Sequence, residues 1–338
     1  MELINLTRFT AERLQTLDRG GREILLVVVK ATFDIQQGRV TPSEEQEPVR
    51  LADEYHGEPG KSSLRHAADS ALLKPATDVL LQGNAYPRQK GDTQVDVSLR
   101  VGGLTKVVRV FGDRRWTKTL GMARMSKPEP LDRVPLVFER AFGGSDLSDP
   151  EKPEWCPSNP VGVGYRREGS KSDVDAMPLP NLEDRAQLLR SPSDRPEPAC
   201  FAPVAPNWSP RVGFAGTYDE KWQADTMPLL PEDFDEQFHQ VAPAQQVYPG
   251  FVIGGEAVEV TGATPEGRLL FSLPKVQPEV QIRIDDELIA PECKCDTVVI
   301  DAERRQLSMA WRATQGVHGR VEEVVWVKVG LHEGSHGR

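Results

Sequence analysis

The chain has 338 residues, a formal net charge of −10 at pH 7 and a pI near 5.3. A chain of this length buries enough surface to form a core without disulfides or a structural metal. The acidic balance, with no run of five or more Lys and Arg residues, argues against binding of a nucleic-acid backbone, and the four cysteines do not suggest a secreted disulfide framework.

The first 30 residues contain no feature of a membrane or secreted protein. The apolar run Ile24–Val29 is far shorter than the roughly 20 residues that cross a bilayer. The opening residues also lack the basic and apolar regions of a signal peptide. We therefore expect a cytoplasmic protein.

Residues 1–144 predict an antiparallel β meander. β-Branched residues are dense in Glu23–Ile35, and the following QQGRV predicts a turn into another strand. Asp78–Tyr86, Val95–Gly103 and Thr105–Gly112 have the same pattern, separated by polar turns.

Residues 145–250 are rich in proline, and this composition predicts an ordered wrap over the strands. Each proline removes a backbone donor and biases its predecessor toward extended geometry, so continuous helices are not expected. One helix is predicted at Pro231–Gln240, because a proline stands in the first turn and Phe234 and Phe238 are spaced i, i+4.

Residues 251–338 predict strands again. Three segments, Glu256–Pro274, Asp296–Arg312 and Val321–His332, have the pattern of hairpins with polar turns. The whole chain is therefore expected to be mainly β, an antiparallel sandwich or distorted barrel with a long proline-rich insertion and few short helices.

The stretch Arg100–Trp116 allows two interpretations. In one, its glycines form turns, its valines face the core and Trp116 packs against the sheet margin. In the other, Arg114, Arg115 and Trp116 form an exposed anchor, because Arg and Trp are enriched at interface hot spots. The sequence favours the sheet corner and leaves the role of the two arginines open.

The cysteines and the short polar motifs give little support for a metal or catalytic site. Cys293 and Cys295 lack the further ligands that a closed zinc site needs, so we expect packed thiols. Ser63, His66 and Asp69 suggest a triad, but no nucleophile elbow is present. A short helix or turn with its polar residues facing water is the simpler interpretation.

Two loops carry carboxylates that would suit a glycosidase. One contains Asn181, Glu183 and Asp184, and the other contains Asp219 and Glu220. Loop capping explains the same residues. We expect no catalytic residue, no cofactor and no metal ligand.

Eight stretches between Asn5 and about Pro274 resemble, in order, a bacterial family of unknown function that is encoded beside type VI secretion genes. The stretches are VVVKATFDI, KPATDVLLQGNAY, VGGLTKVVRVFGDRRW, PLVFERAFGG, NPVGVGY, LPNLED, PNWSPRVGFAGTYDEKW and PLLPEDFDEQFHQVAPAQQ.

The resemblance implies a cytoplasmic adaptor or chaperone without catalysis. Such a protein binds a secreted toxin through its N-terminal region or PAAR domain, keeps it soluble and promotes its loading on the VgrG spike. The positions that match the family and become candidate partner contacts are Arg114, Arg115, Trp116, Asn159, Asn181, Trp208, Arg211, Tyr218 and Trp222.

Two other functions stay open. The first is a carbohydrate-active hydrolase that uses the loop carboxylates. The second is a structural component of the secretion apparatus.

Overall fold

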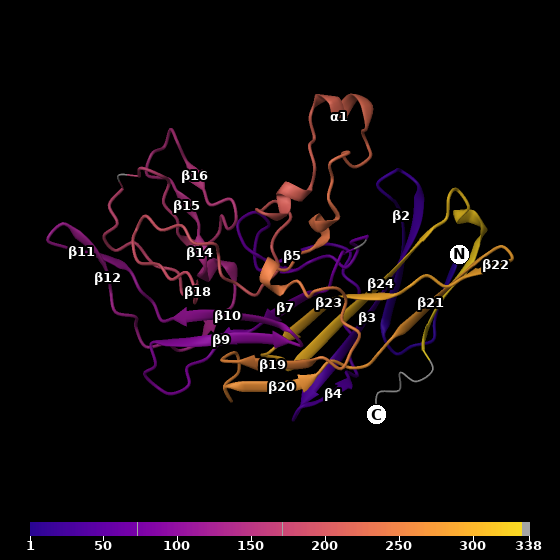
Figure 1. Cartoon of the computed structure of the whole chain (residues 1–338), viewed down its shortest axis with the longest axis horizontal. Helices are drawn as coiled ribbons and strands as arrows, with labels where there is room; N and C mark the ends of the chain where they lie inside the picture. Colours follow the sequence, from indigo (N-terminus) through magenta and orange to yellow (C-terminus); the bar gives the residue numbers. More distant parts are fainter. Residues whose placement is uncertain (73, 171, 333–338) are drawn as a thin grey trace.

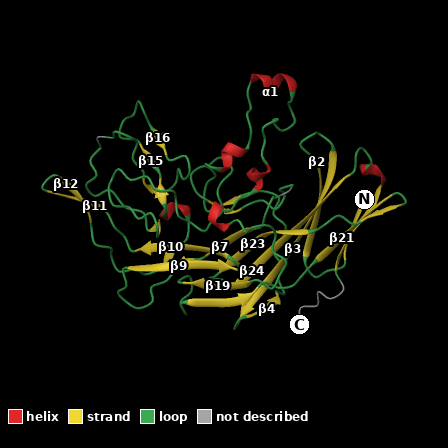
Figure 2. Cartoon of the chain, viewed as in Figure 1, coloured by secondary structure: helices red, strands yellow, loops and turns green. Residues whose placement is uncertain are grey.

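The computed structural model describes residues 1–72, 74–170 and 172–332. Strands dominate these residues, and they form three sheets of four to six strands and five two-stranded pairs. Figure 2 shows that most of the remaining chain is loop. The one described α-helix is α1 (Glu220–Asp225), which projects from the rest of the molecule (Figure 1). The expectation of a mainly β, sandwich-like fold is confirmed.

A six-stranded sheet forms the centre of the molecule (Figure 1). Its path is β2 (Thr10–Leu17), β3 (Glu23–Gln36), β24 (Gln306–Gly316), β23 (Lys294–Asp301) and β7 (Asp78–Gln82), with β4 (Arg39–Pro42) also paired to β3. Five consecutive side chains of β3, Leu25 to Val29, have no exposed surface. Both faces of this strand are therefore covered, which explains why its apolar residues are continuous instead of alternating.

A five-stranded antiparallel sheet packs beside it. Its order is β18 (Leu182–Asp184), β10 (Leu104–Phe111), β9 (Gln94–Val101), β19 (Ala257–Thr261) and β20 (Arg268–Ser272). Alternate residues of β9, including Val95, Val97 and Leu99, are buried. This period of two is that of a sheet with one face in the core.

A four-stranded sheet joins the two ends of the described chain. Its order is β1 (Glu2–Asn5), β25 (Val324–Leu331), β21 (Pro278–Ile284) and β22 (Glu287–Ile289), and β1 is parallel to β25. The short pairs are β5 (Glu54–Tyr55) with β6 (Leu64–His66), β8 (Asn84–Ala85) with β13 (Val134–Pro135), β11 (Trp116–Thr119) with β12 (Met122–Met125), β14 (Phe142–Gly143) with β17 (Val163–Gly164), and β15 (Ser145–Asp146) with β16 (Glu154–Trp155).

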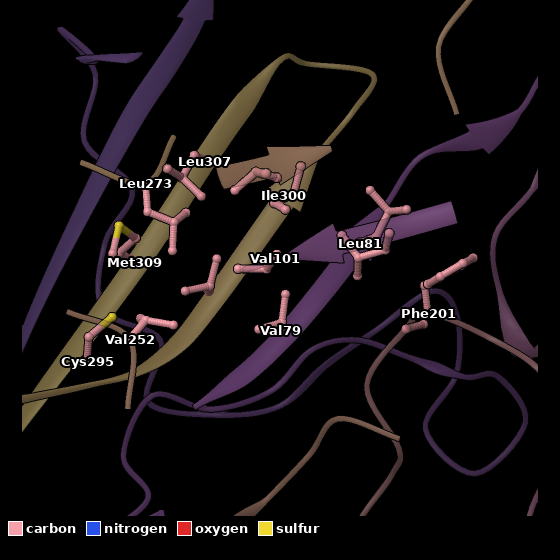
Figure 3. Close-up of a cluster of buried hydrophobic side chains, with 14 of the residues drawn as sticks. Val79, Leu81, Val101, Phe201, Val252, Leu273, Cys295, Ile300, Leu307 and Met309 are labelled. Carbon is pink, nitrogen blue, oxygen red and sulfur yellow. The ribbon is translucent and has the colours of Figure 1, made fainter. Parts of the chain in front are cut away.

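One hydrophobic core connects the inner faces of the three larger sheets. Figure 3 shows part of it, where Val79 and Leu81 of β7 meet Val101 of β9 and side chains of β23 and β24. Phe201, from the proline-rich segment, belongs to the same core. The wrap is therefore packed into the fold and does not merely lie on its surface.

Two local expectations about strand pairing are wrong. β7 pairs in parallel with β23 instead of continuing the meander into β9. Val321–His332 forms a 3₁₀ turn and the single strand β25, whose partners β1 and β21 come from distant parts of the chain. These pairings depend on tertiary contacts, which local alternation does not encode.

The predicted helix at Pro231–Gln240 is also wrong. Only Glu236–His239 is helical, as a 3₁₀ turn, because the carboxylate of Asp235 accepts the Gln237 N–H and starts a new turn there. The predicted contact between Phe234 and Phe238 is present, with ring centroids 5.7 Å apart. The α-helix instead begins after Asp219, whose carboxylate accepts the Trp222 N–H, an N-cap signal that the sequence contains.

No helix among the described residues is long and apolar enough to span a membrane.

Buried Asp78, at the start of β7, fastens the proline-rich segment to the central sheet. Its carboxylate accepts the backbone N–H groups of Val241 and Ala242, at 2.9 and 3.1 Å, and the side chains of Lys74 and Gln240, at 2.7 and 2.8 Å. One side chain thus supplies hydrogen-bond acceptors to a segment that has no β-strand partner to supply them.

We predict that Asp78→Ala lowers the free energy of unfolding by about 3–5 kcal/mol, because it leaves a buried lysine and two amides without their acceptor. Asp286→Ala is the matched control, since the Asp286 side chain is fully exposed and its loss should change stability by less than about 0.5 kcal/mol. Urea unfolding of both variants measures this. Equal stability of the two would contradict the assigned role.

Candidate functional site

The clearest concave feature of the molecule is an apolar groove made of two adjoining hollows. The larger encloses about 600 Å³ and the smaller about 450 Å³. Val204, Pro210, Pro243 and Ala244 line both of them. The two hollows together are called the groove below.

Prolines from several parts of the wrap form the walls of the groove. Pro157, Pro198, Pro210 and Pro243 line the larger hollow, and Pro75 lines the smaller one. A proline ring presents apolar surface, fixes its own backbone and has no N–H to satisfy. The proline-rich composition therefore produces stiff walls with few backbone donors.

The floor of the larger hollow is strand β10, with Lys106, Val107 and Val108. Lys106 is buried, and its ammonium group donates to the Cys200 carbonyl oxygen and, at 2.7 Å, to Gln246 Oε1. It also lies 5.4 Å from the centroid of the Phe201 ring. Burial lowers the pKa of Lys106 to about 8, because the Asp184 charge offsets only part of the lost hydration.

Gln246 does not line either hollow, but it is buried and holds Lys106 of the floor in place. Its Nε2 donates to the carbonyl oxygens of Val79, at 2.8 Å, and Phe201, at 3.0 Å. Lys106 and Gln246 thus connect β10, β7 and the 200–201 backbone. Since their polar atoms are already engaged, the groove offers an occupant mainly apolar contact.

Two carboxylates border the larger hollow. Glu197 is exposed and Asp184 is half-buried, with Gln245 Nε2 at 3.4 Å from Asp184 Oδ2. No cation is hydrogen-bonded to either carboxylate within the part of the chain that the structure describes. The rim of the groove is therefore acidic.

Arg211 supports the smaller hollow. Its guanidinium donates to the carbonyl oxygens of Phe238, at 2.7 Å, and Val204, at 2.9 Å, and lies 5.1 Å from the centroid of the Phe238 ring. Burial lowers the pKa of Arg211 from its usual value. The guanidinium group of Arg211 thus links two backbone segments, at Val204 and Phe238, that are not paired in a sheet.

The structure places five of the nine predicted partner contacts inside the molecule. Arg114 pairs with buried Glu183, donates to the Pro180 carbonyl oxygen at 2.7 Å and stacks on the Phe111 ring. The other four are also enclosed: Asn159 donates to the Phe138 and Phe142 carbonyl oxygens, Asn181 donates to the Phe111 carbonyl oxygen, Trp208 packs edge-on against Phe138, and Arg211 holds the contacts given above. We assign these five to the fold, because their polar groups or rings are engaged inside the protein; Arg211 also lines the smaller hollow.

The remaining four differ in exposure. Trp116 is 3% exposed and packs in a second hydrophobic cluster with Phe142 and Tyr165, as the sheet-corner interpretation expects. Arg115 is exposed. Tyr218 and Trp222 stack edge-on, with ring centroids 4.7 Å apart, on the projecting loop of α1. Arg115, Tyr218 and Trp222 are thus the ones that a partner can reach.

Ser63, His66 and Asp69 do not form a triad, and the expectation that they face water is wrong for two of them. Ser63 is buried and donates to Glu139 at 2.7 Å. Buried Asp69 accepts from Lys30 at 2.9 Å. Burial and the Arg50 charge lower the pKa of His66 to about 4. Each of the three residues thus has a different neighbour, since Gln82 Nε2 lies 3.3 Å from His66 Nδ1.

The carboxylates of the two candidate hydrolase loops have structural partners. Glu183 is buried against Arg114 and also accepts the Leu189 N–H at 2.8 Å. Asp219 caps α1. Capping and pairing thus account for these two acids.

Cys295 is buried and Cys293 is half-buried. Burial raises the pKa of both thiols, that of Cys293 to about 12. The described residues contain no cluster of three or more His, Cys, Asp or Glu side chains arranged to hold a metal ion. These two cysteines pack as neutral thiols.

Sequence analysis missed the residues that build the groove. Lys106 carried a signal, because it occupies an inward position of β10, between Leu104 and Val108 in the alternation. Gln246 and Glu197 carried none, since their positions depend on how an irregular segment folds over two sheets.

Comparison with known proteins gives one match. The family model described as "Uncharacterized protein conserved in bacteria (DUF2169)" matches residues 20–312. No curated protein and no solved structure matches the chain. The match includes the whole groove and every residue of the nine-member set.

The neighbours Arg114 and Arg115 give a matched pair of variants. We predict that Arg114→Ser lowers the free energy of unfolding by about 3–5 kcal/mol, because Glu183 is left as an unpaired buried charge. Arg115→Ser should change it by less than about 0.5 kcal/mol. Thermal and urea unfolding compare the two. A stable Arg114→Ser variant would remove Arg114 from the fold and return it to the candidate contacts.

The lowered pKa of Lys106 predicts a pH dependence. Between pH 8 and 10.5 the unfolded chain binds a proton that the folded Lys106 has released, so stability rises with pH across this window. The gain is about 3 kcal/mol for a shift of this size. We predict that Lys106→Met lacks this rise when unfolding is measured from pH 7.5 to 10.5. Parallel stability curves for wild type and variant would contradict the prediction.

Proposed function

The chain belongs to the uncharacterized bacterial family DUF2169, and from this premise we propose that it is a cytoplasmic type VI secretion adaptor or chaperone. In this proposal it binds a toxic effector through the effector's N-terminal or PAAR region, keeps it soluble and promotes its loading on the VgrG spike. The observation that carries the proposal is the apolar groove. The eight-stretch resemblance supplies the secretion context.

The dimensions and lining of the groove suit a segment of polypeptide. Pockets that enclose drug-sized molecules measure roughly 300–1,000 Å³, and the two adjoining hollows offer about 600 and 450 Å³. An effector segment that is apolar is a liability in water, because each Å² exposed costs about 25 cal/mol and invites aggregation. Covering such a segment is what a chaperone for it would have to do.

The rim indicates which segment is preferred. Asp184 and Glu197 border apolar walls, so an apolar segment flanked by Lys or Arg would bring opposite charges to both carboxylates. Rim charges of this kind contribute mainly to association rate and partner choice. The apolar walls would contribute most of the affinity.

Ala244 allows a direct test, because it is exposed and lines both hollows. We predict that Ala244→Trp fills the groove and reduces co-purification of a PAAR-tipped toxin by at least about tenfold, since even a loss of about 1.4 kcal/mol has that effect. The control is Ala52→Trp at an exposed alanine outside the groove.

The proposal fails if the toxin co-purifies equally with both variants, or stays soluble and is delivered normally in cells that lack this protein. Glu197→Lys provides a finer test, because it should slow association and weaken its dependence on salt while leaving the folded state unchanged.

A further inference from the structure

The β11–β12 hairpin ends in an apolar tip that no other part of the described chain covers. Leu120 is 94% exposed and Met122 is 55% exposed. A Cβ placed on Gly121, between them, would find no atom within 4 Å. The hairpin lies at one end of the molecule in Figure 1, so its tip is the outermost part of that end.

The backbone of the tip is unfavourable for the residue it carries. Leu120 has φ +52° and Gly121 has φ +76°, the left-handed pair of a two-residue hairpin turn. Such turns strongly prefer Asn-Gly, because asparagine tolerates positive φ and leucine does not. Neither turn geometry nor packing explains a leucine at this position.

Positive charges lie along the hairpin and at its base. Residues 114–127 contain five basic residues and no acidic one, in a chain of net charge −10. Arg115, Lys118, Arg124 and Lys127 are exposed. Lys118 pairs with Asp173 at 2.7 Å, whereas no ion pair of Arg115, Arg124 or Lys127 occurs within the described part of the chain. Three free cations therefore accompany the apolar tip.

The base of the hairpin is fixed. Trp116 is buried in the second hydrophobic cluster, and Ala123 packs against the same cluster. The Lys118 N–H donates to Asp175 at 2.9 Å, and the Thr117 hydroxyl donates to the Arg124 carbonyl oxygen at 3.1 Å. The exposed tip is thus attached to a part of the hairpin that is packed and hydrogen-bonded to the rest of the protein.

We propose that the β11–β12 hairpin docks on an anionic lipid surface, with Leu120 and Met122 entering the acyl boundary and Arg115, Arg124 and Lys127 contacting the phosphates. Interfacial anchors combine apolar insertion with electrostatic attraction in this way. A convex tip favours lipid over protein, because a bilayer accepts it without a matching pocket. Long basic side chains also extend to headgroup depth while their stems stay apolar. This docking does not depend on the proposed function of the groove.

The test is flotation of the full chain with phosphatidylcholine vesicles, with and without phosphatidylglycerol. The wild type should float with the anionic vesicles only and detach as salt is raised. Leu120→Asn should reduce the bound fraction by about tenfold or more, from the lost burial of one leucine side chain. The same variant should melt at an equal or higher temperature, because it restores the preferred Asn-Gly turn. Loss of binding then cannot be attributed to unfolding.

Three further variants separate the contributions of the basic residues, the apolar tip and the groove to vesicle binding. Replacing Arg115, Arg124 and Lys127 by Gln should weaken binding about fivefold for each charge and remove the salt dependence. Ile253→Asn removes an apolar side chain that is 85% exposed outside the hairpin and should leave flotation unchanged. Ala244→Trp, in the groove, should also leave it unchanged, so that failure of this proposal is distinct from failure of the adaptor proposal.

The proposal is overturned if the wild type does not float with anionic vesicles, or if Leu120→Asn floats as well as the wild type does. It is equally overturned if flotation is absent while Leu120→Asn weakens toxin co-purification, because the tip would then be a protein contact.

Discussion

The fold depends on hydrogen-bond partners for the proline-rich segment, whose backbone forms few β-sheet hydrogen bonds of its own. Residues 145–250, as far as the structure describes them, pack on the sheets with few and short strands, so their buried N–H and C=O groups have few regular partners. Buried side chains take this role: Asp78 accepts two amides, Gln246 donates to two carbonyl oxygens and Arg211 donates to two more. An unpaired buried polar group costs about 1–3 kcal/mol, so these contacts decide whether the wrap is ordered.

The groove follows from the same constraint. A proline has no N–H, so a segment rich in proline leaves fewer backbone donors to be satisfied where it lines the groove. Lys106 and Gln246 use their polar atoms to hold the floor, and what remains facing the hollow is mostly apolar. Stability and the shape of the groove thus depend on the same residues, and burying the Lys106 charge is the cost of that arrangement.

The sequence predicted the fold class and those elements whose signal is local. The β23–β24 and β19–β20 hairpins and the β9–β10 pair were identified because alternation and turn residues lie within 20 residues of each other. The parallel pairing of β7 with β23 was not predicted, since its partners are some 200 residues apart. The groove was missed for the same reason, because Glu197 and Ala244 come together only after the wrap has folded.

The sequence alone does not separate polar residues that support the fold from polar residues that are free to contact a partner, as two of the candidate contacts show. Arg114 and Arg115 are adjacent and chemically identical, yet one is enclosed between Glu183 and Phe111 and the other faces water. A polar residue that matches the family can therefore be one that hydrogen-bonds to buried irregular backbone, just as readily as one that contacts a partner. The surfaces left over have opposite character: the groove is concave with an acidic rim, and the β11–β12 hairpin is convex and basic. A single ligand matched to one would therefore be mismatched to the other.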